Sequence, residues 1–168
     1  MAHNMFSDMS DEEKKHWMGL RPEMDHSENS EGLPLHSRGK GLGRGLVDIP
    51  TSINHADNKQ MHPVKNQGGC GSCWAFAVTT TLEGTLAVKT NQYYGTDGFN
   101  LRLSEQQGVD CTLTKEYGKG GDYNDFDWDC WGCEGCWMSN FYDYLKYYGA
   151  MTNDDYPYET KQLGNCYF

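Results

Sequence analysis

Seven cysteines in 168 residues constrain this chain more than any other feature of its sequence. Such a content is high for a reducing compartment and indicates disulfide formation. Because the count is odd, we expect three disulfide pairs and one free thiol. Two residues separate Cys70 from Cys73, and the same spacing recurs at Cys130, Cys133 and Cys136. The free thiol among these cysteines is therefore the first candidate for chemistry.

The composition fits one globular domain. Hydrophobic residues make up 37% of the chain and charged residues 23%, which suits a single core and is too little for two. The formal net charge of −10 argues against a nucleic-acid partner, because phosphate binding needs a basic face. No window approaches the roughly 18 apolar residues of a membrane span, so no membrane partner is expected. No signal peptide is visible in residues 1–10.

Apolar periodicity predicts a long helix over residues 72–89. Trp74, Val78, Leu82 and Leu86 recur every four residues and share one helical face. This segment contains three consecutive threonines, whose branched side chains lower helix propensity, so tertiary burial has to stabilise it.

Two shorter helices are expected over 104–109 and 138–148, the first capped by a serine and the second ended by a glycine. Residues 1–20 contain a short helical piece, and residues 21–48 are a glycine-rich extended connector. Residues 111–135 are expected to form a long loop held by disulfides rather than by a core.

The segment Gln67–Phe76, with the sequence QGGCGSCWAF, carries the chemistry. Cys73 stands at the start of the predicted long helix, where the helix dipole and free N–H groups stabilise a thiolate. Gln67 lies six residues earlier in a glycine-rich loop. Its side-chain amide and the Cys73 backbone N–H would together form an oxyanion hole. The pattern predicts a nucleophilic cysteine.

The same segment resembles the active-site signature of papain-like cysteine proteases, C-G-[SA]-C-[WY]. Four further stretches resemble motifs of that family in the same order: Asn4–Asp8, Leu103–Cys111, Gly132–Cys136 and Asp154–Tyr158. The resemblance implies an α+β papain-like fold. This chain would hold mainly its helical left-hand domain, with a long central helix that starts at the nucleophile, while the C-terminal barrel-like domain is missing.

The resemblance also divides the chain into three parts. Residues 1–20 would be the C-terminal end of an inhibitory propeptide, 21–48 its linker and 49–168 the N-terminal part of the peptidase domain. The family's catalytic His and Asn lie roughly 130–150 residues after the cysteine, which is beyond Phe168, and all six histidines precede Cys73. The expected function is that of a cysteine peptidase in a full-length parent, with this chain alone inactive. A non-catalytic fragment or pseudo-protease acting as a binding or inhibitory module remains the alternative.

The resemblance assigns the site residues. Cys73 and Gln67 are catalytic, and the cleft is lined by Gly71, Ser72, Trp74, Gly135, Cys136, Trp137 and Met138, although a core position is the better interpretation of Trp74. The implied disulfides are Cys70–Cys133 and Cys111–Cys166; Cys130 and Cys136 are extra to the family pattern and could either pair with each other or remain unpaired. No metal or other cofactor is implied. The implied partners are protein or peptide substrates and the chain's own propeptide, in a lysosome, a vacuole or outside the cell.

The sequence departs from the family pattern at two places. Cys136 stands where the family has the second glycine of G-C-N-G-G, whose backbone pairs with substrate, so a side chain there could crowd the cleft. Residues 54–56, Asn-His-Ala, replace the family's Asp-Trp-Arg.

Three other interpretations of the motifs are weaker. A zinc ribbon would separate its Cys-x2-Cys pairs by about 15–20 residues, whereas 56 residues lie between Cys73 and Cys130. A redox pair Cys70–Cys73 lacks a preceding βαβ pattern and leaves Gln67 without a role. A calcium loop over residues 122–129 lacks the turn glycine and the closing glutamate.

Overall fold

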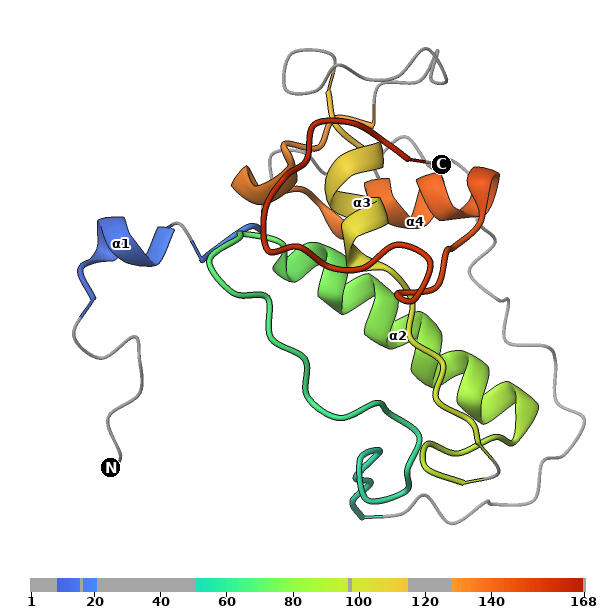
Figure 1. The fold of residues 1–168 in the computed structure, drawn as a ribbon. Coiled ribbons are helices and arrows are strands. Elements are labelled where there is room, and N and C mark those ends of the chain that lie inside the picture. Colours follow the sequence, from blue (N-terminus) through green and yellow to red (C-terminus); the bar gives the residue numbers. More distant parts are fainter. Residues whose placement is uncertain (1–8, 16, 21–50, 97, 115–127, 168) are drawn as a thin grey trace, which may run out of the picture.

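The computed structural model describes residues 9–15, 17–20, 51–96, 98–114 and 128–167. These residues form four α-helices and one 3-10 helix (Figure 1): α1 Asp11–Lys15, α2 Cys73–Thr90, α3 Glu105–Cys111, η3 Gly132–Glu134 and α4 Met138–Tyr148. The described part contains three isolated β-bridges: Leu20 with Cys136, Leu103 with Thr152, and Leu113 with Cys130. The expected connector over residues 21–48 lies outside the described residues, as does most of the hypothetical calcium loop over residues 122–129.

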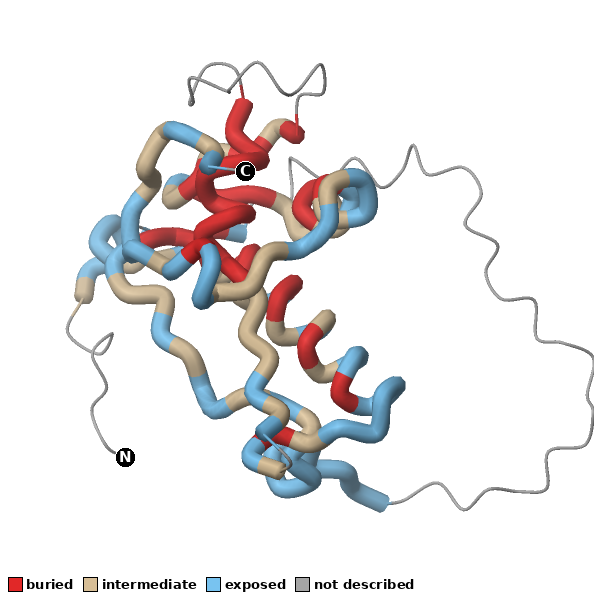
Figure 2. Tube along the Cα trace, turned by 45° about the vertical axis from the view of Figure 1, so that its right-hand side comes forward, coloured by how far each residue is buried: buried red, intermediate tan, exposed pale blue. Residues whose placement is uncertain are grey.

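Helix α2 is the spine of the fold, and both α3 and α4 pack against it (Figure 1). Trp74 and Val78 of α2 are fully buried, and the Trp74 ring meets Phe141 of α4 edge-on at 5.6 Å. Figure 2 shows that the buried positions gather where α3 and α4 lie against the first half of α2. The core therefore lies next to the helix end that carries Cys73.

The buried face of α2 differs from the face that the sequence predicted. Trp74 and Val78 are buried as expected, but Leu86 is 43% exposed, while Glu83 and Ala87 are buried in its place. The difference arises because a row of residues spaced by four drifts around a helix of 3.6 residues per turn. The row that includes Thr79 and Glu83 faces α3.

The threonine run in α2 is stabilised by a tertiary contact, as its low helix propensity requires: the Thr79 hydroxyl donates to Glu105 of α3 at 2.8 Å. The Thr81 hydroxyl bonds within the helix, to the Ala77 carbonyl at 2.7 Å. The helix ends at Asn91, which adopts the left-handed conformation with φ 54°.

Helices α1 and α3 begin at side-chain caps, and α3 and α4 lie within two residues of the bounds that the sequence predicted. Ser104 Oγ accepts from the Gln107 backbone N–H at 3.0 Å, so it caps α3, which extends two residues beyond the predicted end. Helix α4 has the predicted bounds. Helix α1 begins with a capping box, in which the Ser10 N–H donates to the Glu13 carboxylate and Ser10 Oγ accepts from the Glu13 N–H. The Ser10 hydroxyl also donates to the Glu13 carboxylate at 2.7 Å, and this bond, with the one from the Ser10 N–H, lowers the pKa of Glu13.

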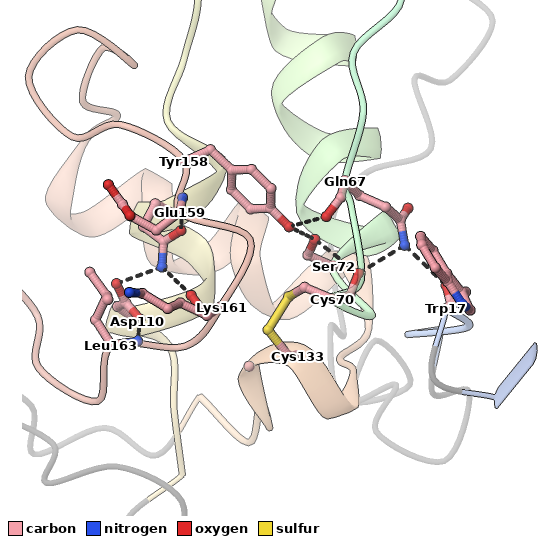
Figure 3. Close-up of a disulfide and its surroundings, with 12 residues drawn as sticks. Trp17, Gln67, Cys70, Ser72, Asp110, Cys133, Tyr158, Glu159, Lys161 and Leu163 are labelled. Atoms are coloured by element: carbon pink, nitrogen blue, oxygen red, sulfur yellow. Dashed lines mark hydrogen bonds between the residues drawn. A yellow bond between two sulfur atoms is a disulfide. The ribbon is translucent and has the colours of Figure 1, made fainter. Parts of the chain in front are cut away.

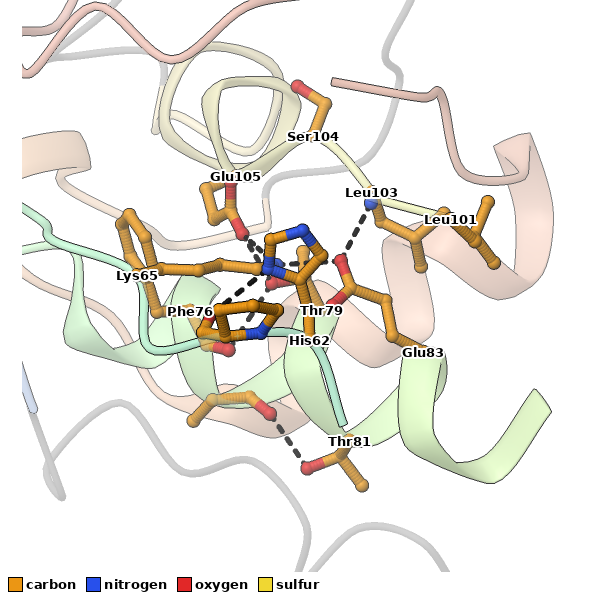
Figure 4. Close-up of polar contacts among 12 residues, drawn as sticks. His62, Lys65, Phe76, Thr79, Thr81, Glu83, Leu101, Leu103, Ser104 and Glu105 are labelled. Atoms are coloured by element: carbon orange, nitrogen blue, oxygen red, sulfur yellow. Dashed lines mark hydrogen bonds and ion pairs between the residues drawn. The ribbon is translucent and has the colours of Figure 1, made fainter. Parts of the chain in front are cut away.

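A buried ion-pair cluster joins the segment before the active-site loop to α2 and α3 (Figure 4). Lys65 Nζ lies 2.6 Å from Glu83 and 2.7 Å from Glu105, and all three side chains are at most 6% exposed. Glu83 also accepts from the Leu103 N–H at 2.7 Å. One cation therefore holds two carboxylates from different helices in the core.

Three disulfides link the described cysteines: Cys70–Cys133, Cys111–Cys166 and Cys130–Cys136. Cys73 is free. Because Cys70 is bonded to Cys133, it forms no redox pair with Cys73, and the zinc hypothesis fails because four of its five thiols are in disulfides.

The expectation that residues 111–135 lack a core needs correction. At the described ends of this loop, Leu113 and Trp128 are each 8% exposed. The Trp128 ring meets Tyr144 of α4 edge-on at 5.6 Å, and the Thr114 N–H donates to the Cys130 carbonyl at 2.8 Å. Aromatic packing and backbone pairing thus hold this region together with its disulfides.

Candidate active site

Cys73 is the first residue of α2, an 18-residue helix whose positive end therefore lies at the thiol. The side chain is free and partly exposed, whereas its neighbours Ser72 and Trp74 are fully buried. The fold thus presents one thiol at the surface on a rigid base. That is the arrangement of a reactive cysteine rather than a structural one.

The loop before α2 turns the Gln67 amide toward the same region (Figure 3). Gln67 Nε2 donates to the Cys70 carbonyl at 2.9 Å and to the Trp17 carbonyl at 3.0 Å. Gly68 has φ +62°, which a glycine adopts at little cost. The Cys70–Cys133 disulfide and a 2.9 Å bond from the Gly71 N–H to the Cys133 carbonyl hold the end of the loop against η3.

An N-terminal segment, residues 17–20, lies across this site. The Trp17 carbonyl occupies the Gln67 amide, and the Gly19 carbonyl accepts from the Cys136 N–H at 2.8 Å. Leu20 pairs with Cys136 in a parallel bridge. A Cβ atom added at Gly19 would overlap the Gly71 carbonyl, so the backbone approaches as closely as two glycines permit. Figure 1 shows this segment running from α1 to the start of α2.

The structure brings two of the expected cleft residues, Gly71 and Cys136, into contact with this segment, and three more follow or precede Cys136 in the chain. Gly71 lies under Gly19, and Cys136 pairs with the segment through its backbone. Gly135 is buried beside Cys136, and the next two residues, Trp137 and Met138, are half-buried at the start of α4.

Cys136 does not crowd the cleft. Its side chain is fully buried and bonded to Cys130, while its N–H donates to the Gly19 carbonyl of the extended N-terminal segment. Cys136 is also absent from the residues with positive φ, so the backbone at this position has no need of a glycine.

Two of the expected substrate contacts are buried in the structure. Trp74 has no exposed surface, and its indole N–H donates to the Gly132 carbonyl at 3.3 Å. Ser72 is equally buried, and its hydroxyl lies 2.6 Å from the Tyr158 hydroxyl. Both side chains support the start of α2, and a contact with substrate stays a prediction for each.

Sequence reasoning missed one residue beside the site. Tyr158 reaches both Gln67 and Ser72, although it lies more than 80 residues further along the chain. Burial raises the pKa of the Tyr158 hydroxyl, and the hydrogen bond from Ser72 lowers it in part. The stretch Asp154–Tyr158, which resembles a family motif, contains this tyrosine, but nothing in the motif indicated that its side chain points toward Gln67 and Ser72.

The two described histidines are engaged away from Cys73. His55 Nδ1 lies 2.7 Å from Gln60 Oε1, and the His62 ring meets Tyr94 edge-on at 5.5 Å. Two surface pockets of about 350 and 420 Å³ lie beside these histidines, and neither is lined by Cys73. Within the described ranges, no group of three or more His, Cys, Asp and Glu side chains could hold a metal ion.

Residues 49–168 match the family described as papain family cysteine protease, and the chain belongs to this family. It is 34% identical over 165 residues to a cathepsin L-like proteinase from Fasciola hepatica, covering 97% of this chain and 41% of that protein. It is 32% identical over 168 residues to procathepsin L from Mus musculus, covering 99% of this chain and 41% of that protein.

Among solved structures, the digestive procathepsin L2 proteinase from Tenebrio molitor larval midgut matches all of this chain and 47% of its own, with a TM-score of 0.75 and 32% identity. The expected papain-like fold is therefore confirmed, with the helical domain as the part described. The chain spans about two-fifths of the length of the curated relatives it matches. A search of the described residues for membrane-spanning helices found none that is long and apolar enough.

Proposed function

We propose that the protein containing this chain is a cysteine peptidase that cleaves peptide bonds through a thiolate at Cys73. The observation that carries the proposal is the 3.0 Å contact between Gln67 Nε2 and the Trp17 carbonyl. An amide donor in the loop that leads to the free thiol already binds a backbone carbonyl of the N-terminal segment, and a backbone carbonyl is the group that a substrate would present. Membership of the papain family supports the same chemistry.

The proposed reaction proceeds in two stages. The Cys73 thiolate attacks the scissile carbonyl carbon, and the negative charge that develops on the oxygen is stabilised by the Gln67 amide and the Cys73 N–H. The amine leaves with a proton, and water then hydrolyses the thioester and restores the thiol. A base must move these protons. The chain's six histidines all precede Cys73 in sequence, and the two that are described are engaged elsewhere. We therefore propose that these 168 residues alone have no turnover.

We also propose that residues 1–20 are the end of an inhibitory propeptide, 21–48 its linker and 49–168 the start of the peptidase domain. The contacts of Trp17 and Gly19 support this division, because they occupy the oxyanion donor and the cleft backbone together. A substrate could not reach Gln67 while the Trp17 carbonyl is bound there. The chain's own N-terminal segment is then its first partner.

The proposed substrates are extended proteins or peptides that pair with the Cys136 backbone as Gly19 does. The reaction needs no cofactor. The three disulfides support a location on the secretory route, in a lysosome, a vacuole or outside the cell.

The test expresses the full-length gene product that contains this chain, removes residues 1–48 by limited proteolysis, and compares the processed protein with its equally processed Cys73→Ser variant on fluorogenic dipeptide substrates. We expect turnover in the parent protein and a loss of at least about a thousandfold in the variant. A parent protein without turnover, or with turnover that survives the substitution, would contradict the proposal. The first of these results would favour the non-catalytic binding module instead.

A further inference from the structure

Tyr158 connects the two residues on which both proposed oxyanion donors depend (Figure 3). Its hydroxyl donates to the Gln67 backbone carbonyl at 2.8 Å and lies 2.6 Å from Ser72 Oγ. Gln67 supplies the first donor through its side chain. Ser72 directly precedes Cys73, whose N–H is the second. One phenol therefore fixes the position of both donors relative to each other.

The hydrogen-bond inventory of this contact is consistent. The phenol has a single proton, which it donates to Gln67, so the Ser72 hydroxyl donates to the phenol oxygen. Because burial raises the pKa of Tyr158, this proton is retained at neutral pH, when the bond to Gln67 needs it.

The tyrosine itself is firmly held. Its ring meets Phe76, in the first turn of α2, edge-on at 4.9 Å and 88°. The next residue, Glu159, donates its N–H to the buried Gln106 side chain of α3 at 2.9 Å. The Tyr158 side chain is therefore fixed by its own contacts, which a residue that positions other side chains requires.

We propose that Tyr158 is a positioning residue. Its two hydrogen bonds fix the distance between the Gln67 amide and the Cys73 N–H, and its side chain does not touch substrate. The inference rests on the proposed roles of Gln67 and Cys73. Oxyanion donors stabilise a developing charge only when they are preorganised, and a displacement of about 1 Å can cost up to a hundredfold in rate. Loss of the hydroxyl releases the Gln67 carbonyl and Ser72 together, and both donors are then less well placed.

Tyr156 provides a matched control within the same motif. It is 6% exposed, and its hydroxyl donates to Asp110 at 2.9 Å and lies 3.3 Å from the Asn165 carbonyl. Tyr156→Phe therefore removes a buried hydroxyl of the same kind two residues away, without a contact to Gln67 or Ser72. A general loss of stability would affect both variants, whereas a positioning effect is specific to Tyr158→Phe.

The first measurement compares kcat and KM of both variants in the full-length gene product after residues 1–48 have been removed by limited proteolysis. We expect Tyr158→Phe to lower kcat by about tenfold with KM within about twofold, because the oxyanion exists only in the transition state. Tyr156→Phe should leave kcat within about twofold while lowering the unfolding temperature. Equal kcat values in the two variants would overturn the proposal.

The second measurement needs no catalysis and uses the 168-residue chain. Amide hydrogen exchange over residues 67–73 should accelerate by about fivefold in Tyr158→Phe, the effect of losing one hydrogen bond. In Tyr156→Phe the acceleration should fall near Asp110 and Asn165 instead.

A parent protein without Cys73-dependent turnover would defeat the proposed function alone. Unchanged exchange at 67–73 would defeat the positioning role alone. If Tyr158→Phe fails to fold, Ser72→Ala removes the second contact and should still lower kcat, and an unchanged kcat would overturn the inference.

Discussion

Gly19 illustrates how the absence of one side chain controls access to the thiol. A Cβ atom at this position would overlap the Gly71 carbonyl, so Gly19→Ala should lift the N-terminal segment from the site and break its bonds to Gln67 and Cys136. We expect Cys73 in the 168-residue chain to react with iodoacetamide about thirtyfold faster, since the two lost bonds contribute roughly 1 kcal/mol each. Mass spectrometry of the alkylated chain measures the rate.

The control for Gly19→Ala is Met18→Ala, because the Met18 side chain is 62% exposed and should not hold the segment. Equal alkylation rates in the two variants would show that the close approach of Gly19 does not close the site.

At Lys65 the presence of a side chain matters, because its buried ammonium group neutralises two buried carboxylates. Lys65→Met would leave the carboxylates of Glu83 and Glu105 in the core without their shared cation. Removing one partner of a buried ion pair costs about 3–5 kcal/mol, and we expect that loss in the free energy of unfolding measured with urea. Lys15→Met breaks a pair that is exposed on both sides and should change stability by less than about 1 kcal/mol. Similar losses in both variants would mean that the buried cluster adds nothing specific.

At the scale of single residues, the sequence indicated candidate reactive groups but not the side chains that support them. Cys73 and Gln67 were proposed because a thiol at a helix start and an amide in a glycine-rich loop form a local pattern, and their catalytic roles stay predictions. The burial of Ser72 and its contact with Tyr158 could not be predicted, because they depend on a segment that lies 86 residues further along the chain. A motif records which residues recur in order, and it does not record which way a buried side chain points.

Helix α3 meets α4 at a glycine, and this contact can be tested. A Cβ atom at Gly108 would lie 2.9 Å from the ring of Phe141, which is fully buried and has no room to move. Gly108→Ala gains up to about 1 kcal/mol in helix propensity but overpacks the interface, and overpacking costs about 1–3 kcal/mol. We expect a net destabilisation in thermal unfolding.

The double variant Gly108→Ala with Phe141→Leu separates the two effects. The smaller side chain makes room for the methyl group, so the double variant should lose less stability than the sum of the single variants. Strict additivity would show that the two positions do not compete for the same space.

Among the elements, existence and bounds were predicted well and the orientation of α2 less well. Capping and stop signals are local, and they placed α3 and α4 to within two residues. The exposure of Leu86 was missed because the four-residue row drifts around the helix, and the burial of Glu83 was missed because it depends on the ion pair with Lys65. Hydrophobic periodicity alone assigns a glutamate to the surface, and only the long-range pair reverses that assignment.

For the molecule as a whole, the least predictable feature was the path of residues 17–20. The bond from Gln67 to Trp17 spans 50 residues, and the segment's sequence has no period that would place it in a cleft. Its position follows from backbone pairing and from one close glycine contact, neither of which requires a recognisable side chain. The resemblance to a propeptide implied a partner, while the atoms that make the contact became known only from the structure.

The whole molecule should also respond to alkaline pH through its buried tyrosines. Burial raises the pKa of Tyr94 to about 12, with the charge of Glu83 adding to the shift, and burial raises the pKa values of Tyr144, Tyr156 and Tyr158 in the same direction. The unfolded chain therefore loses these protons first, near pH 10, and the folded state only at higher pH. The stability they contribute is complete below pH 10 and falls as the pH rises toward 12.

Urea unfolding between pH 8 and pH 11 measures this dependence, and phenolate absorbance reports the titration of the tyrosines. Tyr94→Phe removes one raised group whose hydroxyl bonds to the Leu101 carbonyl at 2.9 Å. It should lower stability at pH 8 by about 1 kcal/mol and flatten the decline above pH 10. The comparison with the unmodified chain cancels the titration of lysines, which occurs in the same range. A decline of equal slope in both proteins would show that Tyr94 titrates alike in the folded and unfolded states, and that its burial does not disfavour the phenolate.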